Sequence, residues 1–429
     1  MPKAVAVEET DFHGWDGVRL SNGMIDAVCV PEIGGRLMQF SLGPHDYLFM
    51  NPDLLGKRFT FEEHAGDGTI VNWKNYGGAK TWPAPQGWDG EGQWPGPPDP
   101  VLDSGRYEYE TNQDDASASV LMTSPPDERS GLRIRRLLSV ETDNSRLLMD
   151  LSFENISNRE IRWSIWDVAQ MLCRTADCKL NDDCWLYIPT DPARERPYEI
   201  MFGDDNPQYQ LDAESGLLAV QYQGIVGKIG VHSPAGWIAF ADKQSGFVLC
   251  MQFPYEPDAE YPDNGATVEC WTESPGAPSP IPIRSPGYIL EAEVLSPLCT
   301  LQPGKVASQR VTWSAAFCPA PIVAVTDFGC AHRTLTVNLD GGWARIRGIF
   351  GCFLDGRAEI ECLDEAGDVV SRLDLGPVSP LRVLRLDAAT QLNDATSLIR
   401  LNILDMDGTY AGTLDSILLN ESVQSSSGA

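Results

Sequence analysis

Hydrophobic and polar residues alternate along this chain in short stretches, and turn residues separate one stretch from the next. An alternation with a period of two is typical of β-strands, whereas the 3.6-residue period of an amphipathic helix is almost absent. The stretches that show it best are Met24–Val30, Leu132–Glu141, Arg146–Asn155, Gly236–Phe240, Gly246–Phe253, Thr267–Thr272 and Tyr288–Leu295. Because such stretches recur over about 300 residues, they predict an all-β fold, a large antiparallel sandwich or barrel. The charged segment Pro189–Asn206 is expected to be a connection inside this fold.

The composition changes near Cys318–Val323, and this change indicates a domain boundary. Beyond Ile322 the chain has no lysine and a single tryptophan, while hairpin patterns recur at Ala358–Leu375 and Leu398–Gly412. These features predict a small second β-domain. The parts that we expect are a large β-domain at residues 1–320, an accessory β-sandwich at 321–423 and a disordered tail at 424–429.

The chain is strongly acidic, with a formal net charge of −29 over 429 residues. Long-range repulsion disfavours nucleic acid and polyanionic polysaccharides as partners, so we expect a neutral or small ligand. Because no apolar run approaches the length of a membrane span and the charged start lacks a signal-peptide core, a soluble cytoplasmic protein is expected. Eleven scattered cysteines predict reduced thiols, and the spacing of Cys173, Cys178 and Cys184 fits no zinc site. We therefore expect no metal and no cofactor, and the sequence does not indicate an oligomeric state.

The segment Asn72–Pro100 concentrates four tryptophans in a run rich in glycine and proline. Such a run predicts an irregular surface loop that no regular element spans. Indoles held there can stack on the C–H face of a sugar ring, while polar side chains bind its hydroxyl groups. A saccharide site is favoured, and the alternative is a loop that plugs one end of the β-fold. The loop residues expected at the ligand are Trp73, Lys74, Tyr76, Lys80, Trp82, Gln86, Trp88 and Trp94.

Four sequence motifs follow one another in a recognisable order. They are NGMIDAVCVPEIGGRLMQF (Asn22–Phe40), YGGAKTWPAPQ (Tyr76–Gln86), YPDNGATVECW (Tyr261–Trp271) and GYILEAEVLSPLCTLQPG (Gly287–Gly304). In this order they resemble the DUF4380 family, and the resemblance covers residues 10–318 approximately. It implies a galactose mutarotase-like supersandwich, as in the aldose 1-epimerase superfamily, with a small-molecule or oligosaccharide ligand.

The resemblance also implies a catalytic base. In the resembling epimerases a strand of the form G-x-x-L-E-x-Q precedes a loop ending in L-x-P-G, and its glutamate is the general base. Gly287, Leu290 and Glu291 match this form, whereas Glu293 replaces the glutamine. Residues two apart on a strand share a face, so these carboxylates would push their pKa values apart and could act as a catalytic pair. The alternative is a solvated pair on an exposed strand face, which the apolar neighbours disfavour.

The acid of the resembling epimerases is a histidine, and this chain departs from them there. None of its five histidines lies in an epimerase motif. The candidates for the acid are His64 and His232. The mid-chain strand where the acid would be expected carries Trp166 and Gln170 instead of a histidine. Two function classes therefore stay open: a carbohydrate epimerase, lyase or hydrolase, and a non-catalytic sugar-binding protein. Further ligand contacts are expected from Arg36, Trp166, Gln170, His232, Glu269 and Trp271. The alternative is a surface ion pair for Arg36 and a structural role for Glu269.

Overall fold

The computed structural model describes residues 4–87, 93–279, 285–340 and 342–419, and the fold is built almost entirely of antiparallel strands. The prediction of a large antiparallel all-β fold is therefore confirmed. The predicted strands Leu132–Glu141 and Arg146–Asn155 have the same bounds in the structure, where they are β9 and β10. The chain divides into two compact units, the second made of Asp143–Ser145, Ser245–Cys250 and Ser314–Ala429.

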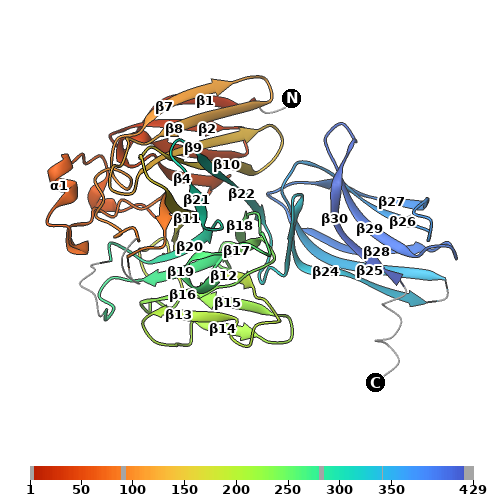
Figure 1. The fold of residues 1–429 in the computed structure, drawn as a ribbon. Helices are drawn as coiled ribbons and strands as arrows, with labels where there is room; N and C mark the ends of the chain where they lie inside the picture. Colours follow the sequence, from red (N-terminus) through yellow and green to blue (C-terminus); the bar gives the residue numbers. More distant parts are fainter. Residues whose placement is uncertain (1–3, 88–92, 280–284, 341, 420–429) are drawn as a thin grey trace. The chain divides into compact units, whose positions relative to one another are not determined.

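The first large sheet has 12 strands and carries the candidate site. Figure 1 shows its central strands side by side. Their order across the sheet is β1 (Ala6–Phe12), β2 (Trp15–Ser21), β3 (Ile25–Val30), β4 (Arg36–Leu42), β6 (Ala79–Ala84), β11 (Ile161–Leu172), β20 (Ile289–Leu295), β19 (Val268–Glu273), β16 (Gly227–Val231) and β13 (Tyr198–Phe202). In addition, β5 (His45–Asp46) pairs with β4, and β21 (Cys299–Leu301) pairs with β11.

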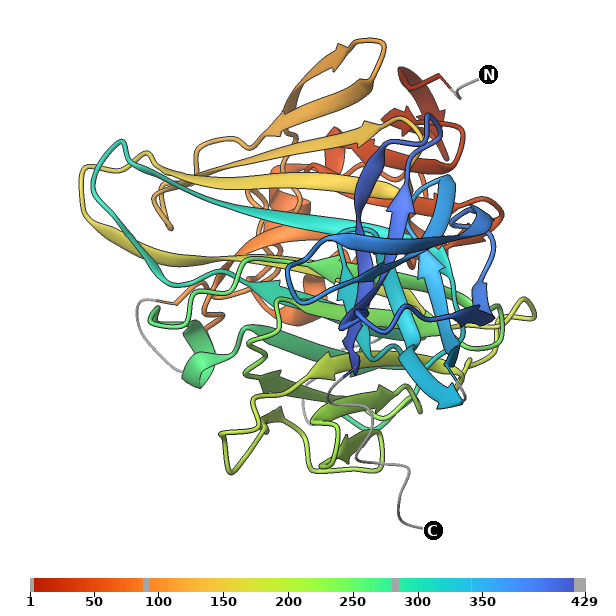
Figure 2. The same cartoon turned by 90° about the vertical axis from the view of Figure 1, so that its right-hand side faces the viewer.

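The second large sheet has 10 strands. Its longest strands run side by side in both views, and Figure 2 draws them in yellow and teal. The order is β14 (Tyr209–Asp212), β15 (Leu217–Gln221), β12 (Cys184–Pro189), β17 (Trp237–Asp242), β18 (Phe247–Gln252), β22 (Val306–Phe317), β10 (Arg146–Asn155), β9 (Leu132–Glu141), β8 (Ser117–Thr123) and β7 (Glu108–Gln113).

The two large sheets pack face to face, and a buried arginine joins them. Arg136 of β9 donates a hydrogen bond to the Ala79 carbonyl of β6 at 3.2 Å and lies 4.0 Å from the Asp167 carboxylate of β11. Since side chains alternate along a strand, Trp166 and Val168 point to the opposite face of the first sheet. That face is also covered, because nine consecutive residues of β11 are buried. The first sheet is therefore enclosed on both faces here.

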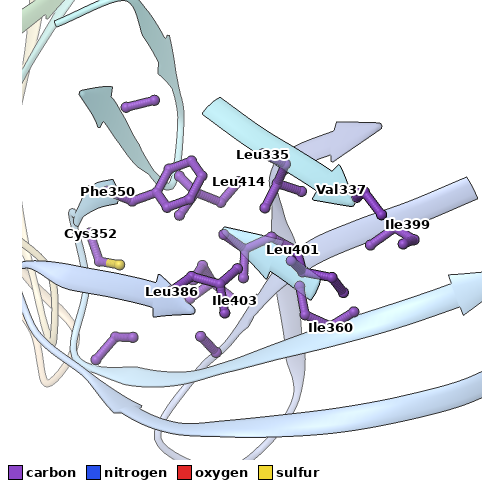
Figure 3. Packing of buried hydrophobic residues seen from close by; sticks show 14 of the residues in the cluster. Leu335, Val337, Phe350, Cys352, Ile360, Leu386, Ile399, Leu401, Ile403 and Leu414 are labelled. Atoms are coloured by element: carbon purple, nitrogen blue, oxygen red, sulfur yellow. The ribbon is translucent and has the colours of Figure 1, made fainter. Parts of the chain in front are cut away.

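The second unit contains two sheets of four strands each. Their order is β23 (Ala324–Thr326), β24 (Gly329–Asp340), β25 (Trp343–Cys352) and β28 (Leu384–Gln391), then β27 (Val369–Val378), β26 (Gly356–Leu363), β29 (Leu398–Leu404) and β30 (Tyr410–Leu418). Inward-facing side chains of both sheets form one core, in which Phe350 and Leu386 meet Ile360 and Leu401 (Figure 3). The unit is a small β-sandwich, and the prediction that residues 321–423 form a separate domain awaits a direct test.

Two expectations about irregular segments differ from the structure. The tryptophan-rich segment contains β6, so residues 79–84 are a strand rather than a loop. Because β6 pairs with β4 only at Ala79, Pro83 lies where that edge is unpaired, which is where a strand tolerates proline. The expected connection Pro189–Asn206 likewise contains the edge strand β13. Short helices α1 (Phe61–Ala65) and α2 (Pro262–Gly265) interrupt the strands.

Candidate functional site

The candidate site lies on the first sheet, on the face that points away from the second sheet. Strand register places its residues in rows, because residues paired across strands share a face. One row contains Gln170, Glu291, Trp271 and Lys228. The next row contains Lys80, Val168, Glu293 and Glu269. Five adjacent strands, from β6 to β16, thus bring five ionisable side chains and one amide to a common face, with Trp82 and Trp166 beside them.

Glu291 is held by two donors that bind the same oxygen. Its Oε1 accepts hydrogen bonds from Lys80 Nζ at 3.0 Å and from Gln170 Nε2 at 2.8 Å. No hydrogen bond reaches its Oε2 from residues that the structure describes. The side chain is 8% exposed and lines a pocket, so the carboxylate is fixed in place with one oxygen available. Burial lowers the pKa of Lys80, and the Glu291 carboxylate opposes this shift.

Lys228 connects the other two carboxylates. Its Nζ lies 2.5 Å from Glu269 Oε2 and 3.2 Å from Glu293 Oε2, and all three side chains are buried. Trp166 donates its indole N–H to Glu293 Oε2 at 2.9 Å, and Lys228 Nζ lies 4.3 Å from the Trp166 ring centre. Burial lowers the pKa of Lys228, but the two carboxylates outweigh burial and the net shift is upward. Burial raises the pKa of Glu293 well above its usual value.

A buried ion pair holds two tryptophans of the site. Asp103 pairs with Arg36, and both side chains are fully buried. The same carboxylate accepts the indole N–H of Trp73 at 2.9 Å and that of Trp82 at 3.2 Å. Lys80 Nζ lies 4.4 Å from the Trp82 ring centre, so the ring faces the Lys80–Glu291 pair. Asp103 therefore sets the orientation of the indoles that border Glu291.

A small pocket of about 50 Å³ opens on this face. Its lining is Ile70, Trp73, Trp82, Gln86, Pro97, Trp166, Gln170, Lys228, Trp271, Glu273 and Glu291. Four indoles and five polar or charged side chains thus meet at one place. Burial raises the pKa of Glu273 to about 7, and the neighbouring Glu291 adds to the shift. The pocket offers flat apolar faces beside a fixed carboxylate, a combination that suits a sugar.

Many of the residues that sequence analysis selected meet at this pocket. Glu291 and Glu293 share a face of β20, as predicted, although Glu293 does not line the pocket and instead contacts Lys228, which does. The selected residues that line the pocket are Trp73, Trp82, Gln86, Trp166, Gln170, Trp271 and Glu291. Lys80 and Glu269 reach them through their ion pairs. The roles of these residues in binding or catalysis stay predictions.

Other selected residues lie elsewhere. His64 is buried against Phe59, with ring centres 5.6 Å apart, and borders a different pocket. His232 lies 3.3 Å from the Tyr255 hydroxyl in a third pocket. Tyr76 is buried, with its ring centre 5.8 Å from that of Trp15.

The remaining selected residues do not line the pocket either. Arg36 is a core ion-pair partner, and Lys74 Nζ lies over the Phe59 ring. Trp94 is buried behind Trp82 and donates to Asp99 at 2.8 Å. Trp88 lies outside the described residues.

Three residues of the site escaped sequence analysis: Lys228, Glu273 and Asp103. Lys228 had a usable signal, because it stands in the buried stretch Gly227–Val231 of a chain that is poor in basic residues. Glu273 follows Trp271 with strand spacing and so shares its face. Asp103 had no signal, since its partners are distant in the sequence.

Among the residues that the structure describes, no group of three or more histidine, cysteine, aspartate or glutamate side chains is arranged to hold a metal ion. Nor does any helix in this part of the chain have the length and hydropathy needed to cross a membrane.

A model of the family DUF4380, described as a domain of unknown function, matches residues 16–316. The chain belongs to the DUF4380 family. This DUF4380 protein matches no curated protein. The family predicted from the four motifs is thereby confirmed.

Several solved structures are similar to this DUF4380 protein. A putative mutarotase from Salmonella typhimurium is 12% identical, with 73% of this chain and 94% of that chain covered and a TM-score of 0.49. A putative aldose 1-epimerase from Klebsiella pneumoniae is 12% identical, with 72% and 83% covered and a TM-score of 0.48. A TPR-domain containing protein from Parabacteroides distasonis is 11% identical at a TM-score of 0.47; 73% of this chain is covered, but only 49% of that chain. These likenesses do not identify a substrate for the DUF4380 protein.

Proposed function

We propose that this protein binds a neutral sugar at the tryptophan-lined pocket and that Glu291 accepts a proton from it, as in the ring opening of an aldose epimerisation. One observation carries the proposal: Glu291 has one oxygen held by Lys80 and Gln170, and no described residue donates a hydrogen bond to its other oxygen, beside four indoles. A carboxylate that is fixed but not fully bonded can take a proton from a bound hydroxyl group.

The size of the pocket suggests how a sugar would bind. Ligand pockets usually have about 300–1,000 Å³, whereas this one has about 50 Å³. We therefore expect one edge of the ring, with the anomeric hydroxyl and the ring oxygen, to enter it. The rest of the ring would lie against the exposed parts of Trp73 and its neighbours. Only that edge takes part in ring opening, so shallow binding is compatible with the reaction.

The electrostatics favour a ligand without charge. The protein carries a net charge of −29, and the carboxylates of the site add negative charge around the pocket. The two lysines of the site, Lys80 beside the pocket and Lys228 in its lining, are already paired with carboxylates. An anionic sugar would therefore meet repulsion without a free cation to offset it.

Binding is tested by calorimetry with a panel of neutral monosaccharides and short oligosaccharides. We expect Trp73→Ala to weaken the binding of any ligand by about 1–3 kcal/mol, the size of a lost stacking contact. Trp343→Ala is the matched control, because Trp343 is 53% exposed and belongs to the second unit. Equal affinities of both variants and the native protein would contradict a role for the pocket.

Catalysis is tested by NMR measurement of anomer exchange in the sugars that bind. Glu291→Gln retains the shape but cannot accept the proton, so exchange should slow by about 10²–10⁴-fold with affinity changed less than about threefold. Glu128→Gln, at an exposed position, serves as the control. If the native protein binds sugar without accelerating exchange, the protein is a sugar-binding module and the catalytic half of the proposal is wrong.

A further inference from the structure

A second carboxyl group lines the same pocket. Glu273 is the last residue of β19, is 3% exposed and stands beside Glu291 in the lining. Its Oε1 is buried without a hydrogen-bond partner in the described part of the chain. Buried polar atoms are nearly always bonded, so an unpaired one in a side chain that lines a pocket requires an explanation. A ligand atom would supply the missing partner.

The two pocket carboxyls have different surroundings. The Glu291 carboxyl accepts hydrogen bonds from the Lys80 ammonium and the Gln170 amide. For Glu273, burial and then the Glu291 charge raise the pKa to about 7, while Trp271, Lys80 and Ser285 oppose the shift. Lys228 of β16 also lines the pocket, but Glu269 and Glu293 hold its charge. Near neutral pH Glu273 is therefore partly protonated, and it stands beside a carboxyl group that two donors hold, which is the arrangement of an acid–base pair.

We propose that Glu273 is the general acid of this site and donates a proton to the ring oxygen of the bound sugar. This inference rests on the proposed function. None of the described residues in the pocket lining is a histidine, so Glu273 fills a role that no imidazole there can take. Lys80 is a weaker candidate, because its ammonium group is bound to Glu291, faces Trp82 and does not line the pocket.

The proton balance closes with these two groups. Glu291 takes the proton of the anomeric hydroxyl while Glu273 gives its proton to the ring oxygen, and the bond between the anomeric carbon and the ring oxygen breaks. The product is the open-chain aldehyde with a free hydroxyl group. After rotation about the adjacent carbon–carbon bond, that hydroxyl oxygen attacks the carbonyl carbon. Its proton returns to Glu273, and the new anomeric oxygen takes the proton from Glu291, which restores both residues.

The test compares Glu273→Gln with Glu291→Gln and the control Glu128→Gln, using anomer exchange over a range of pH. For the native protein kcat/KM should fall above about pH 7, because Glu273 loses its proton there. Glu273→Gln should lower kcat by about 10²–10⁴-fold, change affinity less than about threefold, and remove the alkaline fall from the residual activity. Exchange that slows in Glu291→Gln but not in Glu273→Gln overturns this inference alone. If no sugar is turned over, the proposed catalysis fails and the acid role fails with it.

A second measurement does not depend on turnover. In protein labelled with ¹³C at glutamate carboxyl groups, Glu273→Gln identifies the Glu273 signal by its loss. We expect that signal to titrate near pH 7 in the native protein and at lower pH in Glu291→Gln, because the neighbouring negative charge is gone. Titration near the ordinary glutamate value in the native protein overturns the inference, even if sugar binds.

Discussion

Replacing Lys228 by methionine removes the cation that lies between Glu269 and Glu293. Methionine keeps the length and apolar character of the side chain, so the change is mainly one of charge. Burial already raises the pKa of Glu293, which leaves Glu269 as the carboxylate that depends most on Lys228. Without the ammonium group, Glu269 either keeps an unpaired charge in the protein interior or takes up a proton.

Proton uptake limits the loss of stability, and the limit can be calculated. An unfolded glutamate has a pKa of about 4.3, and holding its proton costs about 1.36 kcal/mol for each pH unit above that value. The free energy of unfolding should therefore fall by up to about 3.7 kcal/mol at pH 7 and by about 1.6 kcal/mol at pH 5.5. Because holding a proton costs more as the pH rises, the deficit is absent below the unfolded pKa and grows above it. Loss of the ammonium contact with Trp166 adds up to about 1 kcal/mol at every pH.

The assay is urea unfolding at pH 5.5, 6.25 and 7, followed by circular dichroism and tryptophan fluorescence. Lys243→Met is the matched control, because Lys243 Nζ lies 3.6 Å from the Trp185 ring centre and has no carboxylate in an ion pair with it in the described chain. In Lys243→Met the free energy of unfolding should fall by about 1 kcal/mol, and this loss should not depend on pH. The double variant Lys228→Met/Glu269→Gln should recover most of the stability. A deficit that does not change with pH would refute the reasoning.

Three further predictions concern other parts of the molecule. Asp103→Asn should lower the free energy of unfolding by about 3 kcal/mol, because Arg36 loses its buried partner, and a loss below about 1 kcal/mol in urea would contradict this. Of the eleven free thiols, the exposed Cys178 should react first with a thiol reagent and Cys299 more slowly. Fast reaction of a third cysteine in native buffer would contradict the burial of the other nine. A chain ending at residue 320 should fold and bind the same sugar, which circular dichroism and calorimetry can measure. If the shortened protein is insoluble or does not bind, residues of the second unit are needed for the site.

The sequence was sufficient to predict the fold where alternation was strong. Strands β9 and β10 each have one buried and one more exposed face, so a period of two marked their ends correctly. The edge strand β13 was missed because most of its side chains are exposed and no alternation reveals it. β6 was missed because all six of its residues are buried and one of them is a proline.

The site could be predicted only within single strands. The common face of Glu291 and Glu293 follows from spacing alone, and the structure confirms it. The pairing of Glu291 with Lys80 depends on the order β6, β11, β20 in the sheet, which no local pattern contains. The histidines were selected because their chemistry fitted an acid. Their positions in other pockets depend on how distant segments pack, and spacing does not report this.

The rows of the site join residues that lie far apart in the chain. Lys80 and Glu291 are separated by 211 positions, and the strand between them in the sheet, β11, comes from a third part of the sequence. No single hairpin or short fragment can therefore contain the whole pocket. Such distant pairings form slowly, since a large loop must close before any contact rewards it. During synthesis the site would be assembled only after β20 has left the ribosome, so recovery of ligand binding should be a late signal in refolding.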